Sequence, residues 1–576
     1  MSKNDLLSKI LYEAKSYNSI DDIEKMVEFG TDLSVIPIQP LYMSLKMTST
    51  DQVAELIPKL SPVQRQVMLD LDLWKKDQVD VDAFEFWIEA YSKVDNDDII
   101  QGFVTSEDFY LYLKSRVNVY TFDVEDPYYP DDDNYFLTDD MLLLIEYSSE
   151  YKYPNELKYL IKHIYAKFGV ENAYSLLFKL VNDSYSELEE QMYQFKKERL
   201  RDYGFVDYYE AIEKLHPFIS EKQILLFLKN KKTITPNLDL NSQNQSLHKS
   251  SIVSFDSEMD NIIKELSYIT DEKRLIYLHF TFIRLINSTI VIHDALKSSR
   301  VELTRIGKYT KNSLELGLQF AKANLTLAEN ESLFEKFDFF DLYKIGNALI
   351  MIQRDRLKKA LKKTLFETED YEYFLGASWN TFLENSDNEI PKVKAYGAGL
   401  NAKEVNNLVV YEFWKNEISL FTNSLPFINT FFETFNKLKT DGKLFDSFYL
   451  NYEVENIDFE SILISSFINH SLGNYSNSDV NKMGVTISEL KSFFKLYFTK
   501  KNEDSEYVLL PLNSDKVKES IEKFIKNFGF NMIDNFENYL YGVLSEHLSG
   551  YEFDTLADED FKHIGGPILL NSLPNN

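Results

Sequence analysis

The sequence contains no cysteine among its 576 residues. This absence excludes disulfide bonds, thiolate zinc sites, iron–sulfur clusters and cysteine nucleophiles together, because each of them requires a cysteine sulfur. It does not locate the protein, since a periplasmic protein can also lack cysteine. Sites that depend on cysteine chemistry are therefore excluded, whatever the compartment.

Positive charge is scarce. The chain has 62 lysine and arginine residues against 92 aspartate and glutamate residues, a formal net charge of −30. Binding to a phosphate backbone requires a clustered positive surface, and a strongly acidic chain is repelled by DNA, RNA and anionic lipid. We therefore expect no nucleic-acid partner. A protein partner with a basic surface fits this charge, because opposite charges steer association.

Long hydrophobic runs are also lacking. The longest apolar stretch, residues 277–292, is interrupted by His279, Arg284 and Asn287. It is shorter than the roughly 20 apolar residues that span a bilayer. The first 16 residues do not have the basic, apolar and small-residue regions of a signal peptide. We expect a cytoplasmic protein without direct membrane insertion; the alternative is a peripheral location reached through a partner.

No known catalytic or cofactor-binding motif is found. None of the eight histidines has the i, i+4 spacing of a helical zinc pair. Glu213 and His216 match the Glu-x-x-His motif of di-iron bundles, but such a bundle needs a second copy. Nucleophile-elbow, Walker, kinase and dinucleotide-binding motifs are absent. We predict no catalytic residues and no cofactor, while scattered acidic residues that converge in the fold stay possible.

Capped amphipathic helices are the dominant signal. Ser61, Pro62 and Gln64 form the start of a capping box, and the apolar residues that follow to Trp74 have helical spacing. Asp80 or Asp82 begins the next helix. Many such segments follow one another with short polar joints. This series predicts a mainly α fold, a helical repeat-like (superhelical) array with minor β hairpins.

Composition suggests two lobes. The apolar share of 44% and the aromatic share of 15% suffice for sizeable cores. Residues 229–255 are polar, rich in serine, asparagine and glutamine, and lack helical periodicity, so they predict a linker or mobile loop. We expect an N-terminal helical lobe at 1–228 and a C-terminal aromatic-rich helical lobe at 256–576. In the latter, the broad apolar face of residues 271–297 predicts a central core helix.

Residues 117–138 depart from the helical pattern. Val117, Val119 and Phe122 alternate at a β period, so we predict a small two-stranded hairpin here, followed by a helix at 139–147. A further strand is predicted at 507–510. The acidic tip of the hairpin contains weak candidates for a cation site, Asp126, Asp131, Asp132 and Asp133. A solvated loop tip is the favoured interpretation, since the tip lacks the glycine that a calcium loop needs.

Tyr203, Tyr208 and Tyr209 cluster around a predicted helix end at Gly204. Glycine can take the left-handed conformation that stops a helix, and Asp207 can begin the next one. The three rings are weak candidates for a partner- or ligand-binding platform. The favoured alternative is that they are buried, with their hydroxyl groups reaching water.

Three segments carry a resemblance to a known family. LDLDLW at 69–74, RLRDYGFVDYYEA at 199–211 and HIGGPILL at 563–570 resemble the hallmark segments of an uncharacterised proteobacterial family, a domain of unknown function. The resemblance covers most of the chain and implies a bacterial origin, but no activity. Residues 41–103 are also similar, more faintly, to the helical superhelix of magnesium-transporter cytoplasmic and flagellar-switch domains, which is an analogy of fold alone.

The function is not determined by these features. The favoured hypothesis is a non-enzymatic acidic helical scaffold that binds a protein partner, since the chain combines capped helices, acidic charge and absent motifs. The alternative is an enzyme, or a sensor of a small ligand or ion, with a pocket between the two lobes.

Overall fold

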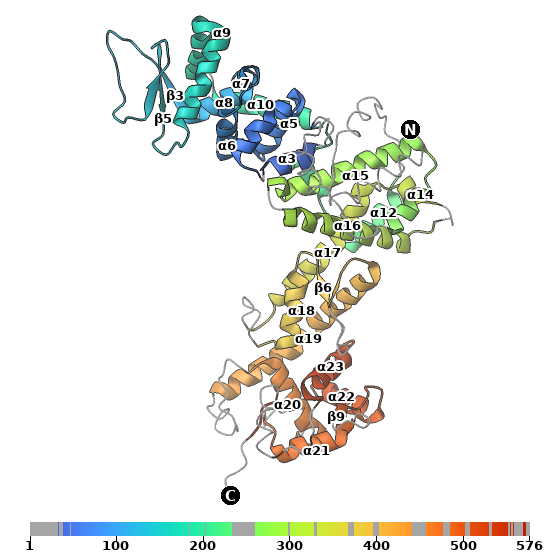
Figure 1. Cartoon of the computed structure of the whole chain (residues 1–576). Coiled ribbons are helices and arrows are strands. Elements are labelled where there is room, and N and C mark those ends of the chain that lie inside the picture. The colour runs from blue at the N-terminus through green and yellow to red at the C-terminus, as the bar shows by residue number, and fades with distance from the viewer. Residues whose placement is uncertain are drawn as a thin grey trace. The chain divides into compact units, whose positions relative to one another are not determined.

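The computed structural model describes most of the chain (Figure 1). The described residues are 33, 38–46, 48–182, 184–201, 203–232, 260–297, 300–327, 331–366, 374–394, 402–440, 457–475, 484–500, 507–528, 533–550, 553, 557 and 568–571. They are mainly α-helical, which confirms the predicted fold class. Their strands form small antiparallel sheets. The superhelical arrangement stays a prediction.

The internal contacts of the chain divide it into two compact units. Unit 1 comprises Met1–Pro217 and Leu226–Lys344, and unit 2 comprises Phe218–Leu225 and Ile345–Asn576. The predicted linker at 229–255 lies mostly outside the described residues. The predicted lobes at 1–228 and 256–576 therefore stay a prediction.

Unit 1 contains most of the described helices and five of the described strands, β1 to β5. Its elements in chain order are α3 (Ile38–Lys46), α4 (Thr50–Leu56), η2 (Ile57–Lys59), α5 (Pro62–Asp72), β1 (Trp74–Lys75), β2 (Gln78–Val79), α6 (Val81–Ser92), α7 (Asp97–Val104), α8 (Glu107–Arg116), β3 (Val117–Thr121), β4 (Tyr135–Leu137), β5 (Leu143–Tyr147), α9 (Pro154–Asn182), α10 (Tyr185–Arg201), α11 (Tyr208–Leu215), α14 (Asp260–Ser267), α15 (Glu272–Ile292), η3 (Ala295–Lys297), α16 (Arg300–Asn324) and η4 (Leu333–Glu335). Helices α12 (Glu221–Asn230) and α17 (Phe339–Leu361) each contribute residues to both units.

Helix α5 begins with the predicted capping box. Ser61 Oγ accepts the Gln64 N–H at 3.2 Å, and the Gln64 side chain accepts the Ser61 N–H at 3.0 Å. Pro62 occupies the first turn, where its missing N–H leaves no hydrogen bond unmade. The helix starts where its sequence predicts because both orphan donors are satisfied locally.

The end of α5 differs from the prediction. The helix stops at Asp72, and Trp74 begins the hairpin β1–β2, in which Lys75 pairs with Gln78. Lys76 in the turn has a φ of 62°, a left-handed conformation that is uncommon for a residue other than glycine. The Val79 N–H donates to Glu189 of α10 at 3.0 Å. A tight, strained turn is therefore fixed against α10.

The predicted hairpin at 117–138 is a three-stranded sheet. Its order is β3-β5-β4, so the two predicted strands pair with β5 and not with each other. The helix predicted at 139–147 is wrong, because most of that segment forms β5. Leu143, Leu144 and Ile145 are buried in succession, and a short apolar run of this kind suits a central strand as well as a helix. The strand predicted at 507–510 is present as β9 (Tyr507–Leu509).

The corner between α10 and α11 depends on Gly204. This residue has a φ of 77°, as the sequence predicts for a helix end, and Asp207 accepts the Tyr209 N–H at the start of α11. A Cβ atom at Gly204 would lie 2.8 Å from Ile283 Cγ2 of α15. Asn287 of α15 donates to the Gly204 carbonyl at 3.0 Å. Only glycine allows α15 to pack this closely against the corner.

Helix α15 is the core helix of unit 1. Leu275, Leu278 and Phe282 of its predicted apolar face are fully buried. Within the described residues it is the one helix whose length and hydropathy would allow it to cross a membrane, and 67% of that apolar window is buried inside the protein. Such burial is typical of a core helix in a soluble protein.

Unit 2 combines helices with two further hairpins and an aromatic core. Its remaining elements are α18 (Ala377–Asp387), β6 (Lys392–Val393), β7 (Lys403–Glu404), α19 (Leu408–Thr440), α20 (Phe459–Ser471), α21 (Ile487–Tyr497), β8 (Phe498–Lys500), β9, α22 (Asp515–Asn527) and α23 (Phe536–Leu548). Trp379 stacks on Tyr539 with ring centroids 4.6 Å apart. Leu570, from the third hallmark segment, is buried and forms a parallel bridge with Val485. The described part of that segment therefore packs in the core of unit 2.

Replacing Gly204 with alanine should destabilise unit 1 more than the same change at Gly169. Both glycines have positive φ, so both alanines cost about 1–2 kcal/mol of backbone strain. Only the Cβ at position 204 would also collide, with Ile283, which adds about 1–3 kcal/mol. Urea denaturation followed by circular dichroism measures the difference. An equal loss of unfolding free energy in the two variants would contradict the close packing of α15 against Gly204.

Candidate functional site

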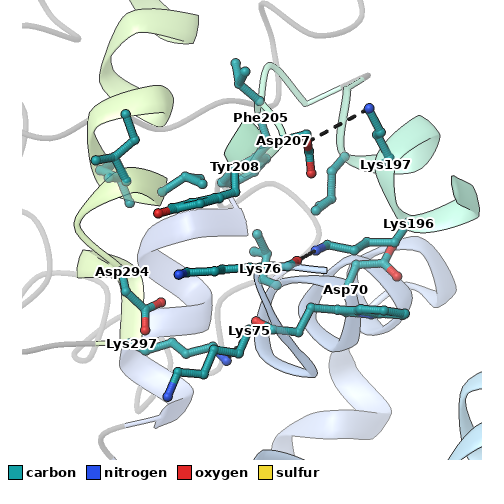
Figure 2. Close-up of a pocket in the computed structure, with 17 residues that line it drawn as sticks. Asp70, Lys75, Lys76, Lys196, Lys197, Phe205, Asp207, Tyr208, Asp294 and Lys297 are labelled. Atoms are coloured by element: carbon teal, nitrogen blue, oxygen red, sulfur yellow. Dashed lines mark hydrogen bonds and ion pairs between the residues drawn. The ribbon is translucent and has the colours of Figure 1, made fainter. Parts of the chain in front are cut away.

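A cavity of about 350 Å³ lies within unit 1 (Figure 2). Four segments line it: the end of α5 with its hairpin, helix α10, the corner leading into α11, and the end of α15 with η3. The lining residues are Asp70, Leu71, Trp74, Lys75, Lys76, Lys196, Lys197, Leu200, Phe205, Val206, Asp207, Tyr208, Ile290, Val291, Ile292, Asp294 and Lys297. The first two hallmark segments thus meet around one cavity.

Lysines are concentrated on this cavity. The hairpin supplies Lys75 and Lys76, helix α10 supplies Lys196 and Lys197, and η3 supplies Lys297. Figure 2 shows these side chains approaching from separate parts of the chain. In a protein of net charge −30, five amines around one small volume form a local site of the opposite sign.

Two of the three aspartates that line the cavity, Asp70 and Asp207, already have partners. Asp70 is held by Arg199, with Nε and Nη2 donating at 2.7 and 2.6 Å. Asp207 accepts from the Tyr193 hydroxyl and from the Tyr209 N–H, and Lys197 Nζ lies 4.0 Å from it. Because these donors already offset the negative charge of Asp70 and Asp207, the two carboxylates neutralise the other lysines of the cavity less.

Lys196 lies across the aromatic wall of the cavity. Its Nζ is 5.1 Å from the ring centroids of both Trp74 and Tyr193 and donates to the Lys76 carbonyl at 3.4 Å. Burial lowers the pKa of Lys196 to about 8, and the charge of Lys297 acts in the same direction against the opposing effect of nearby carboxylates. A fraction of this amine is therefore neutral near physiological pH.

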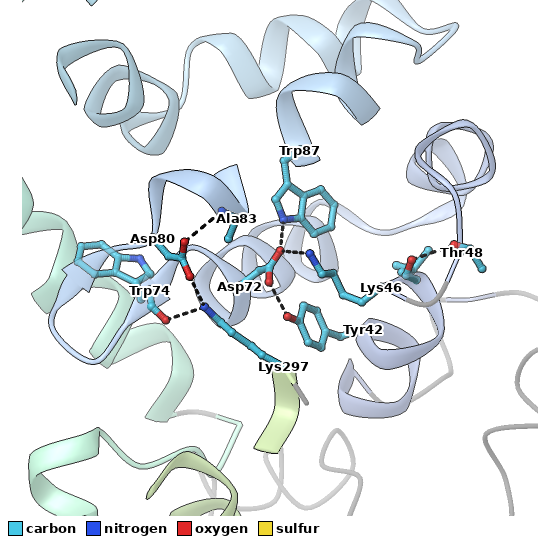
Figure 3. A network of polar contacts seen from close by, with 10 residues as sticks. Tyr42, Lys46, Thr48, Asp72, Trp74, Asp80, Ala83, Trp87 and Lys297 are labelled. Atoms are coloured by element: carbon cyan, nitrogen blue, oxygen red, sulfur yellow. Dashed lines mark hydrogen bonds and ion pairs between the residues drawn. The ribbon is translucent and has the colours of Figure 1, made fainter. Parts of the chain in front are cut away.

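Two other lysines are fixed by contacts at the rim. Lys76 Nζ lies 4.9 Å from the centroid of the Tyr208 ring, a cation–π distance. Lys297 donates to the Trp74 carbonyl at 3.0 Å and to Asp80 at 3.3 Å, as Figure 3 shows. Between these amines, Leu71, Ile290 and Val291 provide apolar surface. The cavity therefore offers cationic donors and an apolar wall together.

Buried carboxylates at the end of α5 hold the hairpin in place. Asp72 accepts hydrogen bonds from the Tyr42 hydroxyl at 2.6 Å, from Trp87 Nε1 at 2.7 Å and from Lys46 at 2.9 Å (Figure 3). Two residues earlier, Asp70 faces α10 and pairs with Arg199. The alternating aspartates of LDLDLW thus bind different neighbours, and the hairpin follows directly from this anchored helix end.

A second buried acid, Asp108, lies beside the Asp70–Arg199 pair. Gln66 donates to Asp108 at 2.8 Å and is 3.4 Å from Asp70. Burial raises the pKa of the Asp108 carboxyl to about 6, and the charge of Asp70 adds to this shift. Asp70 itself has a raised pKa because burial outweighs its contacts with Arg199.

The three predicted tyrosines have different places. Tyr203 is buried in an apolar cluster with Val67 and Leu200. Tyr208 lines the cavity, while Tyr209 is exposed and its hydroxyl donates to Asp77 at 3.2 Å. The rings of Tyr208 and Tyr209 pack edge to face with centroids 5.4 Å apart, and Tyr208 belongs to the candidate site. A role of the three tyrosines in binding a partner or ligand stays a prediction.

The four aspartates predicted as weak cation ligands lie on the exposed loop between β3 and β4. Asp126, Asp131, Asp132 and Asp133 are all solvent-exposed. Within the described residues, no group of three or more histidine, aspartate and glutamate side chains is arranged to hold a metal ion. These four residues lie outside the candidate site.

The lysines of the cavity were missed at the level of sequence. Two signals were present: the pair Lys75–Lys76 directly follows LDLDLW, and the pair Lys196–Lys197 lies one residue before RLRDYGF. The two pairs are separated by more than a hundred residues. Only the packing of α5 against α10 shows that they share one cavity.

Replacing Asp108 with asparagine should change the pH dependence of stability. In the folded protein this carboxyl has a pKa of about 6, whereas an aspartate in an unfolded chain titrates near 3.9. Between about pH 4 and pH 6 the folded state binds more protons, so the stability contributed by Asp108 falls as pH rises. Asparagine does not titrate, and its carbonyl can still accept from Gln66.

The variant should gain up to about 3 kcal/mol over the parent protein between about pH 4 and pH 7. Urea denaturation at a series of pH values measures this gain. Asp82→Asn is the matched control, because the Asp82 side chain is 92% exposed. Parallel profiles for the parent and both variants would contradict the buried, protonatable state of Asp108.

Comparison with known proteins identifies the family. Residues 10–566 match the model of a Family of unknown function (DUF6178). No curated protein and no solved structure matches the chain. The similarity to transporter and flagellar-switch superhelices therefore stays a prediction. Because the family match spans nearly the whole sequence, the chain belongs to this family, which confirms the predicted membership in a family of unknown function.

Proposed function

We propose that this member of the DUF6178 family binds a small organic anion in the lysine-lined cavity of unit 1. The observation that carries the proposal is the convergence of five lysines on one cavity of about 350 Å³ in a strongly acidic chain. This volume lies within the range of small-molecule sites, which is roughly 300–1,000 Å³. The predicted alternative of a small-ligand sensor is therefore preferred over a scaffold alone.

Electrostatics favours an anion as the occupant. Five amines at close quarters repel one another, and a buried amine loses its hydration. The lowered pKa of Lys196 reflects both effects. A carboxylate or phosphate would accept hydrogen bonds from several lysines at once and offset their mutual repulsion.

The shape of the lining restricts the rest of the ligand. Ile290, Val291 and Leu71 offer aliphatic surface, and Trp74 and Tyr208 offer aromatic surface. A ligand that carries an apolar body next to its anionic group would use both kinds of wall. A bare inorganic ion would leave the apolar wall unused. The proposed class is therefore a compact carboxylate or phosphate with an aliphatic or aromatic body.

A second proposal retains the predicted protein partner with a basic surface. Its support is the β3–β4 loop, where exposed aspartates lie beside Tyr128, which is 70% exposed. Tyrosine is enriched at protein–protein interfaces, and acidic side chains around it would complement a basic partner surface. A cytoplasmic location, without nucleic acid or direct membrane insertion, belongs to this proposal. The burial of α15 supports the absence of insertion.

The loop proposal is tested by affinity capture from native lysate with elution in rising salt. A partner that is lost when Asp131, Asp132 and Asp133 are replaced together by asparagine is the expected result. A partner held equally by both baits would place the interaction elsewhere, and no specific partner would contradict a scaffold function.

Replacing Lys75 and Lys76 together by glutamine should weaken anion binding. The probes are phenyl phosphate and hydroxyisocaproate, with phenol as the uncharged match, measured by isothermal titration calorimetry. Loss of two charge-assisted contacts should raise the Kd by about 10- to 100-fold. The matched control is Lys59→Gln with Lys152→Gln, which changes the net charge equally at exposed residues outside the cavity.

Two results would contradict the proposal. Binding of neither probe by the parent protein would remove the anion site. Equal weakening by both double variants would show that the probes respond to overall charge and not to the cavity. Phenol should bind at least about tenfold more weakly than phenyl phosphate, since it lacks the group that the lysines contact.

A further inference from the structure

We propose that the Lys196 amine condenses with the carbonyl group of a small oxo acid bound in the cavity, forming an imine. This inference rests on the proposed anion site and names its substrate class, an aldehyde or ketone that carries a carboxylate. The carboxylate would contact Lys75, Lys76 or Lys297, which would place the carbonyl carbon near Lys196.

The position of Lys196 distinguishes it from the other lysines of the cavity. Lys75 and Lys76 are solvent-exposed, whereas Lys196 is partly buried. Lys297 is bound to Asp80, and Lys197 lies near Asp207. Among the described residues, Lys196 Nζ has no carboxylate at ion-pair distance; its contacts are the rings of Trp74 and Tyr193 and one long hydrogen bond to a carbonyl. An amine that lies on ring faces keeps its lone pair available whenever it is neutral.

The charges around Lys196 come from every neighbouring element. Those that face it are Asp70 of α5, Lys76 and Asp77 of the hairpin, Asp207 before α11, and Asp294 and Lys297 at η3. Burial lowers the pKa of Lys196 to about 8 in spite of the carboxylates, and Lys297 contributes to the lowering. At pH 8 such an amine is neutral about 100-fold more often than a lysine in water.

The condensation balances without any further reagent. The Nζ lone pair of neutral Lys196 attacks the carbonyl carbon, and the carbonyl oxygen takes a proton from solvent to give a carbinolamine. Nitrogen releases one proton, a second proton from solvent binds the hydroxyl oxygen, and the carbon–oxygen bond breaks as that oxygen leaves as water. The iminium ion that remains returns its last N–H proton to solvent and becomes the imine. One carbonyl oxygen and the two amine hydrogens leave as that water, and a carbon–nitrogen double bond remains. Lysine amines that are desolvated beside other cations are suited to this step.

Reductive trapping tests the imine with three matched probes. Full-length protein is incubated at pH 8 with ketoisocaproate and cyanoborohydride, which adds hydride to an imine. Hydroxyisocaproate has the same anion without the carbonyl group, and methyl isobutyl ketone has the carbonyl group without the anion. Intact mass followed by peptide mapping locates any secondary amine.

The expected result is one adduct per chain on Lys196 with ketoisocaproate and none with hydroxyisocaproate. Methyl isobutyl ketone should react at least about tenfold more slowly, because it lacks the carboxylate that the lysines hold. Lys196→Arg should abolish the adduct while keeping hydroxyisocaproate binding within a few-fold, since the positive charge is preserved. Lys152→Arg is the matched control, because Lys152 is exposed and lies outside the cavity, and it should react as the parent protein does.

The outcomes separate this inference from the anion site on which it rests. Calorimetric binding of hydroxyisocaproate without an adduct from ketoisocaproate would overturn the imine and leave the anion site intact. Absence of both binding and adduct would overturn both. Adducts spread over surface lysines, or an adduct that persists in Lys196→Arg, would also overturn the assignment of Lys196.

Discussion

The paired contact between Arg199 and Asp70 is the interaction on which the cavity of unit 1 depends. It joins α10 to α5 with two parallel hydrogen bonds of 2.7 and 2.6 Å to a fully buried carboxylate. The planar guanidinium suits this geometry, and lysine would not replace it. Removing Arg199 would leave the buried Asp70 carboxylate without its cationic partner, which costs up to about 3–5 kcal/mol. The same pair brings two lysine dipeptides, one after α5 and one inside α10, to a single cavity.

The charged residues of this acidic protein have different roles at different places in the fold. The buried aspartates at the end of α5 each have a defined set of donors, and these contacts anchor the hairpin. On the β3–β4 loop, acidic side chains are solvated. The cavity gathers five lysines around apolar walls. The buried acids thus act in structure, while the lysines supply the chemistry that we propose.

Much of the fold follows from local signals. The capping box at Ser61, the cap at Asp80 and the helix end at Gly204 were predictable because the atoms that satisfy each signal lie within a few residues of it. Strand β5 was not predictable, because its short apolar run fits the period of a helix as well as that of a strand. Its pairing is decided by partners that are distant in the sequence. The cavity was beyond prediction for the same reason. Tyr208 was a candidate from sequence, but its relation to Lys76 and Lys196 depends on contacts between helices.

The most direct measurement of the central claim is a crystal structure of the full-length protein grown with bromophenyl phosphate, analysed by anomalous scattering from bromine. The account predicts an anomalous peak against the apolar wall near Trp74 and Ile290, with the phosphate within hydrogen-bond distance of at least two of the cavity lysines. A cavity closed by ion pairs between its own lysines and aspartates, with bromine bound elsewhere or nowhere, would contradict it.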